Sequence, residues 1–290
     1  LEQIQKAMPV EFDAINYREV NAPQGKTLAK TILDNPELKA VWKIEYITCD
    51  SEDFVIPGGF GKIVFLAPRQ ESLEAIDSQF KDEFNKYFMQ VWKEGIENSE
   101  ELQELLIRFV DAYKDKYVSK QISAKKEIVY DASFVKKQAN EEDTDSSDTN
   151  YSSIAFMIEC GEHKIAMLGD SFASTIEKAI DNKYVDVAKP IKCDAIKVSH
   201  HGSNGNSSKS LFERINSHKY FIPGGKGEKY PSWGTLGRIA ETCKDEEDKL
   251  IVFSHSCAIT QKMNELGDED KRKLGIKTII TEEEYELFEW

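Results

Sequence analysis

The fold expected for this chain rests above all on residues 194–203, which have the sequence DAIKVSHHGS. The run from Cys193 to Val198 predicts a β-strand. Ser199 follows it, and two adjacent histidines, His200 and His201, come next. In α/β proteins the loops at strand ends open to solvent while the sheet fixes their positions, so functional groups gather there. His200 and His201 are therefore candidate functional residues.

A predicted β-hairpin lies just upstream. Its strands cover residues 153–160 (SIAFMIEC) and 164–168 (KIAML), and the second strand ends in Gly169-Asp170. The second strand of the hairpin is thus predicted to end just before the carboxylate of Asp170. Asp and His together are typical ligands of Zn²⁺ or Mn²⁺, and a carboxylate can bridge two metals because it has two oxygens. Each signal is weak alone, since most His pairs are surface or core residues; their order and context make them a candidate site.

In the flanking sequence, predicted helices alternate with predicted β-strands. Helices are predicted over residues 174–182 and 233–243 and after residues 207–208, and strands over residues 62–66, 219–222 and 250–253. Residues 277–280 and 285–290 predict a closing hairpin. Strands that alternate with helices are typical of an α/β layered fold.

Two segments interrupt this alternation. Residues 70–120 carry apolar side chains mostly at three- and four-residue steps, which predicts two helices forming a hairpin. Residues 136–150 (KKQANEEDTDSSDTN) are polar and acidic, which predicts a mobile loop; an acidic metal-binding role is the alternative.

The composition narrows the classes of function. The chain has 290 residues and a net charge of −14, which disfavours a nucleic-acid binder unless a local basic patch or a metal cluster compensates. It contains no apolar run of 18 residues, so we expect no membrane contact.

Five scattered cysteines without a CxxC motif indicate a reducing compartment, and we expect the protein to be cytoplasmic. Residues 1–8 do not look like a secretory signal, and the missing initiator Met indicates a chain that is not a whole gene product.

Several stretches resemble the metallo-β-lactamase superfamily, and most closely its branch found as the soluble domain of bacterial DNA-uptake competence proteins. The stretches that carry the resemblance are residues 22–28, 63–68, 150–153, 167–170 and 194–203. The similarity runs from about residue 14 to residue 240, with residues 70–120 as an apparent insertion. It implies one domain over residues 1–290, an αββα sandwich with a dinuclear metal site at one edge.

The resemblance also implies roles for single residues. Asp170 corresponds to the carboxylate that bridges both metals, and His200 or His201 corresponds to the last histidine ligand. The expected cofactor is two Zn ions, with Mn as the alternative. Next to the implied site, the candidate substrate contacts are Ser203, Asn204, Lys226 and Tyr230.

Three departures from the family pattern stand out. The hallmark His-x-His-x-Asp-His is absent, and we expect it, with the first strands, to precede Leu1. Asn150 and Ser152 occupy the region of the middle histidine motif, as is usual in the competence-like branch. Tyr230 stands before Pro-Ser where that branch often has His, which puts a substrate contact or an outer ligand in doubt.

Three hypotheses about function follow. The first is a metal-dependent hydrolase, a phosphodiesterase or nuclease, whose partner is nucleic acid or a small phosphodiester. The second is a degenerate, metal-free member that acts as a scaffold or regulatory subunit, with protein partners in a complex. The third and weakest is hydrolysis of a small ester, lactam or thioester, which the family also supports.

Overall fold

The computed structural model describes residues 34–36, 46–76, 78, 128–141, 143, 147–224, 230–242 and 248–281, with only the backbone at residues 148 and 149. The chain divides into two compact units, one of residues 1–46 and 77–126 and the other of residues 47–76 and 127–290. Nearly all described residues belong to the second unit, which carries the candidate site. The helical hairpin predicted over residues 70–120 lies mostly outside the described residues, although residues 70–76 are helical.

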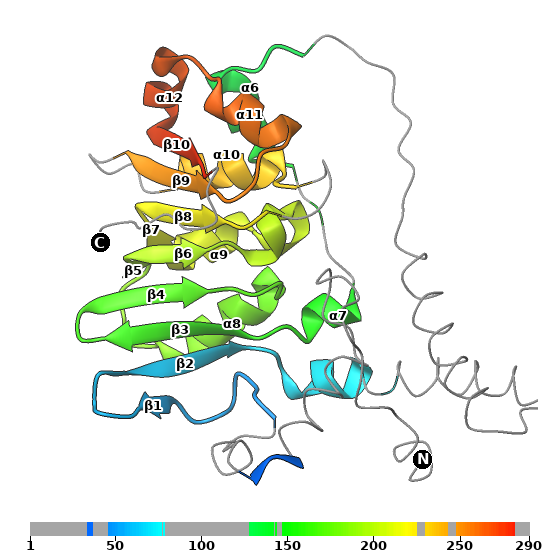
Figure 1. Cartoon of the computed structure of the whole chain (residues 1–290), viewed down its shortest axis with the longest axis vertical. Coiled ribbons are helices and arrows are strands. Elements are labelled where there is room, and N and C mark those ends of the chain that lie inside the picture. Colours follow the sequence, from blue (N-terminus) through cyan, green and yellow to red (C-terminus); the bar gives the residue numbers. More distant parts are fainter. Residues whose placement is uncertain are drawn as a thin grey trace, which may run out of the picture. The chain divides into compact units, whose positions relative to one another are not determined.

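The second unit is built on one large mixed sheet (Figure 1). Its strand order is β1-β2-β3-β4-β6-β8-β9-β10, and a separate small sheet pairs β5 with β7. The pairs β1–β2, β2–β3 and β3–β4 are antiparallel, whereas the pairs β4–β6, β6–β8, β8–β9 and β9–β10 are parallel. The strands are β1 (Phe54–Ile56), β2 (Gly61–Ala67), β3 (Ala155–Cys160), β4 (His163–Met167), β5 (Ile191–Cys193), β6 (Ala195–Lys197), β7 (Ile215–Ser217), β8 (Lys219–Ile222), β9 (Lys249–Phe253) and β10 (Ile276–Ile280).

Helices alternate with the parallel strands, so the α/β class predicted from the sequence is confirmed. The helices are α6 (Ala132–Gln138), α7 (Asp148–Tyr151), α8 (Ala173–Lys183), α9 (Lys209–Arg214), α10 (Trp233–Glu241), α11 (Ala258–Asn264) and α12 (Asp268–Leu274), with 3-10 turns η1 (Ser199–Gly202) and η2 (Asn204–Asn206). No helix of the described part is both long and apolar enough to cross a membrane.

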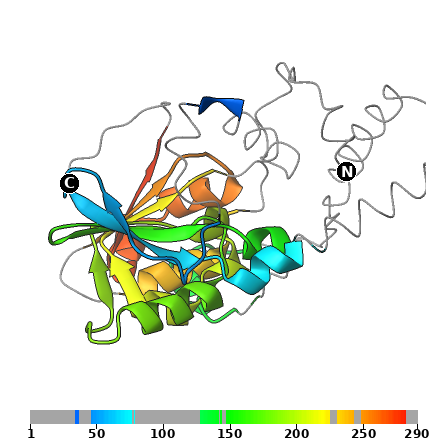
Figure 2. The ribbon, with the colours of Figure 1, turned by 90° about the horizontal axis from the view of Figure 1, so that it is seen from below.

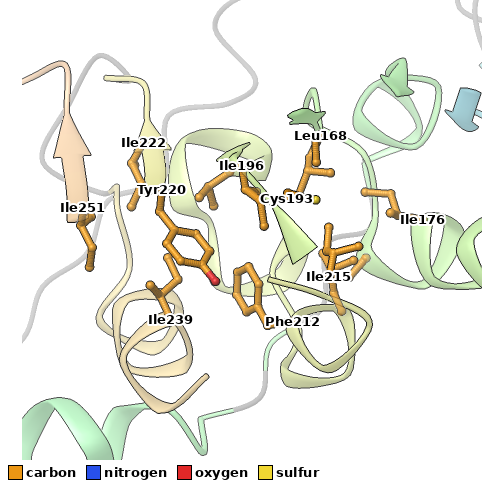
Figure 3. Packing of buried hydrophobic residues seen from close by; sticks show 14 of the residues in the cluster. Leu168, Ile176, Cys193, Ile196, Phe212, Ile215, Tyr220, Ile222, Ile239 and Ile251 are labelled. Carbon is orange, nitrogen blue, oxygen red and sulfur yellow. The ribbon is translucent and has the colours of Figure 1, made fainter. Parts of the chain in front are cut away.

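One face of the sheet is covered by α8, α9 and α10 (Figure 2). Consecutive cross-strand partners point toward these helices and lie in one buried cluster. These partners are Val64, Met157, Ala166, Ile196, Tyr220 and Ile251. Figure 3 shows Ile196 and Tyr220 from the strands meeting Phe212 of α9 and Ile239 of α10. This helix-covered face is the hydrophobic core of the unit.

The opposite face of the sheet is also apolar. A residue adjacent to each of these partners forms a second cross-strand row, consisting of Phe65, Phe156, Met167, Lys197, Phe221 and Val252. None of the six belongs to the cluster under the helices. Phe65 and Val252 are buried, and Phe156, Met167 and Phe221 are half-buried. We call this row the second face; parallel sheets normally have both faces covered.

The structure differs from the sequence prediction at two segments. The single strand predicted over residues 193–198 is broken at Asp194, because its backbone N–H donates to the carbonyl of Lys164 and its carboxylate accepts from the Lys164 N–H, both at 2.7 Å. The loop predicted over residues 136–150 overlaps the end of α6 and the start of α7. The N-cap of α6 is Asp131, whose side chain accepts a hydrogen bond from the Phe134 N–H at 2.7 Å. Of the predicted closing hairpin, residues 276–280 form β10, which is parallel to β9, and residues 285–290 lie outside the described residues.

Candidate functional site

The two predicted strand ends lie side by side. The strands β4 and β6 are parallel neighbours, and Met167 pairs with Lys197 at their carboxyl ends. Asp170 follows β4 by three residues and His200 follows β6 by three. The backbone N–H of His200 donates to the carbonyl of Gly169 at 3.0 Å. The sheet therefore brings Asp170 and the His200-His201 pair to one edge, where Figure 1 also places α7.

The position of Asp170 is fixed by the turn that precedes it. Gly169 has φ +55, and a Cβ there would lie 2.4 Å from the carbonyl oxygen of Ile154, so no larger residue fits. The Asp170 N–H donates to Oγ of Ser153 at 2.9 Å. The Ser171 hydroxyl donates to the carbonyl of Ser153 at 2.6 Å. These bonds hold the backbone, and the carboxylate keeps 38% of its surface exposed.

Lys197, the last residue of β6, is the cation of the site. Its Nζ donates to the Gly169 carbonyl at 2.6 Å and lies 3.7 Å from Oδ1 of Asp170. Burial lowers the pKa of Lys197 below its ordinary value, while the Asp170 carboxylate acts in the opposite direction. The ammonium group therefore closes the turn and neutralises part of the charge of Asp170.

Both histidines have left-handed backbone conformations. His200 has φ 43 and ψ 55, and His201 has φ 53 and ψ 23. A residue with a Cβ pays about 1–2 kcal/mol for this conformation, and such strain is concentrated at functional sites. Gly202 follows with φ +80, and its carbonyl accepts from the backbone N–H of Ser232 at 2.9 Å. The strained turn is thus held by the start of α10.

The His200 ring sits in a network of side chains. Its Nδ1 lies 3.1 Å from Oδ1 of Asn206 and 3.2 Å from Nδ2 of Asn150 in α7. Asn206 in turn donates from Nδ2 to the Asp170 carbonyl at 3.1 Å. The ring of Tyr230 lies beside the imidazole, with 5.1 Å between the centroids. Asn206 therefore connects the two candidate ligands, His200 and Asp170.

The His201 ring is held by the backbone. Its Nδ1 lies 3.2 Å from the carbonyl oxygen of Pro223, at the end of β8. A carbonyl oxygen only accepts, so Nδ1 donates, and in the neutral ring the lone pair is on Nε2. A ligating histidine commonly donates its other ring N–H to a carbonyl or carboxylate in this way. The two imidazoles lie 6.0 Å apart between centroids.

The donor types fit a zinc or manganese site, but the donor set is incomplete. One carboxylate and two imidazoles, from Asp170, His200 and His201, are the ligand types that these metals prefer. Among the described residues, no three His, Cys, Asp or Glu side chains form a group that could hold a metal ion, so Asp170, His200 and His201 do not by themselves form a metal site. Further ligands would have to come from outside the described residues.

The predicted substrate contacts lie in different surroundings. Ser203 is only 6% exposed, and its carbonyl accepts from the Thr235 hydroxyl at 3.0 Å. Asn204 donates from Nδ2 to the carbonyl of Glu141 at 3.2 Å. Tyr230 is half-buried beside His200, and Lys226 lies outside the described residues. A role of these four residues in substrate binding stays a prediction.

Sequence reasoning did not single out two residues of the site. Lys197 was part of the quoted stretch, but its apolar neighbours gave no sign that its ammonium turns back to Gly169. Asn206 stands in a polar run, Ser203 to Ser208, that looks like an ordinary loop. Asn206 is completely buried, which indicates a structural role, and this burial can be seen only in the folded chain.

Comparison of the chain with protein-family models, with curated proteins and with solved structures finds no match.

Proposed function

We propose that this chain carries part of the dinuclear metal centre of a hydrolase with the metallo-β-lactamase fold, and that its substrate is a phosphodiester. The observation that carries the proposal is the link from His200 through Asn206 to Asp170 at one sheet edge. One buried side chain thus contacts the imidazole of His200 and the backbone carbonyl of Asp170, in the turns that follow two different strands. A polar partner at the ring nitrogen of a histidine is typical of metal-ligating histidines.

The second face supports the finer fold in this proposal. An αββα sandwich packs a second sheet against the first, and the contacting face of each sheet must be apolar. Five of the six residues of the second face are apolar, with Phe156 and Phe221 half-buried. A second sheet packed on this row would bury them and leave Lys197, at the strand end, near the metal site.

The proposed roles follow from the chemistry of each group. Asp170 and either His200 or His201 would be the residues of the described part that hold the ions. The chemistry that Zn or Mn would supply there, when bound, is an activated water and stabilisation of negative charge on a phosphoryl oxygen. The net charge of −14 requires cations near the site for an anionic substrate, and Lys197 and Lys226 are the candidates.

A second candidate function is a metal-free scaffold or regulatory subunit. The observation that favours it is the ion pair between Lys197 and Asp170. The ammonium group lies beside the carboxylate that would bridge the metals, so it can take the place of a cation. In this alternative the same side chains stabilise the sheet edge and the protein acts through a partner.

Metal analysis separates the two functions. Plasma mass spectrometry on the full-length gene product is expected to find about two Zn or Mn ions per chain. The triple variant Asp170→Ala, His200→Ala, His201→Ala is expected to lose them. The matched control is His163→Ala, since His163 is 77% exposed and pairs only with the carboxylate of Asp194 among the contacts described.

Each result decides between the alternatives. Loss of metal in the triple variant, with retention in the control, supports the hydrolase, and the protein is then assayed with a chromogenic phosphodiester. Absence of metal in the unmodified protein overturns the hydrolase and supports the partner-binding module. Equal metal content in all three proteins would place the metal elsewhere and also contradict the proposed site.

A further inference from the structure

The orientation of the Asn206 amide is fixed by the backbone of Asp170. Its Nδ2 lies 3.1 Å from the Asp170 carbonyl oxygen, which only accepts, so the NH₂ group must be on that side. Asn206 is completely buried, so water would not compensate an amide that turned its oxygen toward this carbonyl. The amide oxygen is therefore the atom that faces Nδ1 of His200 at 3.1 Å.

An oxygen that faces a ring nitrogen requires a proton on that nitrogen. Since Oδ1 of Asn206 only accepts, its contact with His200 is a hydrogen bond only if Nδ1 is protonated. The contact with Asn150 requires an unprotonated Nδ1 instead. Nδ2 of Asn150 lies 3.2 Å from the same nitrogen and would donate to a lone pair there. Asn150 is only half-buried, so the cost of losing this bond is smaller than for Asn206.

We propose that Asn206 is a positioning residue that holds the proton of His200 on Nδ1 and so places the lone pair of this imidazole on Nε2. The assignment concerns the neutral ring and goes beyond the proposed hydrolase, because it holds with or without a bound metal. Its consequence is that both histidines of the strained turn have the same tautomer, one set by a side chain and the other by the carbonyl of Pro223. Both rings then present Nε2 as the basic atom, whether toward a metal or toward a proton.

The test is nitrogen NMR of the full chain, treated with a chelator and labelled with ¹⁵N. Long-range proton–nitrogen correlation spectra distinguish a protonated ring nitrogen from one with a lone pair. They are recorded about two pH units above the ordinary imidazole pKa of about 6.5. Signals are assigned with single His→Gln variants. In the unmodified protein, His200 is expected to show a protonated Nδ1 and an unprotonated Nε2.

Two variants test the part played by Asn206. Asn206→Leu removes the acceptor and leaves Asn150 as the polar side chain at Nδ1, so the protonated Nδ1 signal of His200 is expected to be lost. Asn206→Asp keeps an acceptor oxygen beside Nδ1 of His200, although it loses the donor to the Asp170 carbonyl, and the protonated Nδ1 signal is expected to remain. His201 is the internal control, because the Pro223 carbonyl is present in every variant.

The outcomes that overturn the proposal are specific. A proton on Nε2 of His200 in the unmodified protein would show that Asn150 sets the tautomer, and this result needs no variant to fold. An unchanged His200 spectrum in Asn206→Leu would show that Asn206 has only a packing role. A change at His201 in the same variant would indicate a general disturbance of the turn, and Asn206→Asp alone then decides.

Discussion

Nζ of Lys197 lies 3.7 Å from Oδ1 of Asp170, at the carboxyl ends of the two adjacent parallel strands β4 and β6. The same ammonium group donates to the Gly169 carbonyl at 2.6 Å, so it holds the turn that leads to the carboxylate. Lys197 is thus the one cation in the six-residue row of the second face, and its ammonium group contacts the turn that leads to Asp170.

Replacement of Lys197 by Met is expected to lower the free energy of unfolding by about 1–3 kcal/mol, because the Gly169 carbonyl loses its donor in a partly buried place. Lys197→Arg keeps the charge and is expected to cost less. Urea unfolding measures both values. A loss below about 0.5 kcal/mol for Lys197→Met, the range of ordinary surface substitutions, would show that the ammonium does not hold the turn.

His201 allows the backbone strain to be measured with a matched pair of variants. His201→Gly and His201→Ala remove the same imidazole and the same bond to Pro223, but only Gly adopts φ 53 without strain. We expect the Gly variant to be more stable than the Ala variant by about 1 kcal/mol in urea unfolding. Equal stability of the two variants would show that the turn relaxes and stores no strain.

Arg238 fixes the loop that contains Asn206. It is 5% exposed, and its guanidinium donates to the carbonyls of Asn204 at 2.9 Å, Ser207 at 2.8 Å and Ala139 at 3.1 Å, and to that of Glu141.

Arg238→Met is expected to cost about 2–4 kcal/mol of unfolding free energy, since several buried carbonyls lose their donor. The control is Arg272→Met on the exposed side of α12, for which we expect a change within about 0.5 kcal/mol. Similar small changes in the two variants would mean that the loop does not depend on Arg238.

The second face gives a test of the sandwich fold. If another layer covers it, Phe156→Ala is expected to cost about 3–5 kcal/mol, as is usual for a buried aromatic residue. Phe60→Ala is the matched control, because Phe60 is 75% exposed and should contribute less than about 0.5 kcal/mol. If both variants unfold at the same urea concentration as the unmodified protein, no layer packs on this row and the αββα proposal fails.

Cys193 is predicted to resist thiol reagents. Burial raises its pKa to about 12, and the thiolate is the reactive form, so almost none is present at neutral pH. We expect iodoacetamide to label the partly exposed Cys160 long before Cys193, as measured by mass spectrometry of peptides.

The same shift predicts a pH dependence of stability. The unfolded thiol loses its proton near pH 9 and the folded thiol only near pH 12, so Cys193 makes stability fall as the pH rises between these values. Cys193→Ala removes this contribution. Early labelling of Cys193, or an identical pH dependence in the variant, would contradict its burial.

The local pattern of the sequence determined most of the elements. Runs such as residues 61–67 and 155–160 are strands because β-branched and aromatic side chains there fit a buried sheet. The glycine at position 169 and the polar residues after β6 also mark strand ends correctly. Such signals depend on neighbours within a few residues, so they can be read without the fold. The metal, the substrate and the sandwich stay predictions.

The way in which the strand ends combine follows from long-range contacts in the folded chain. Asp194 breaks a run that looks continuous in sequence, because its backbone and carboxylate bind Lys164, thirty positions away along the chain. In the same way, Asn206 joins Asp170 to His200, and the Lys197 ammonium turns back to Gly169. These contacts arise when parallel strands place distant loops at one edge, and no local propensity encodes them. Local sequence patterns predicted Asp170, His200 and His201 as candidate residues at strand ends, and the pairing of β4 with β6 brings these strand ends to one edge.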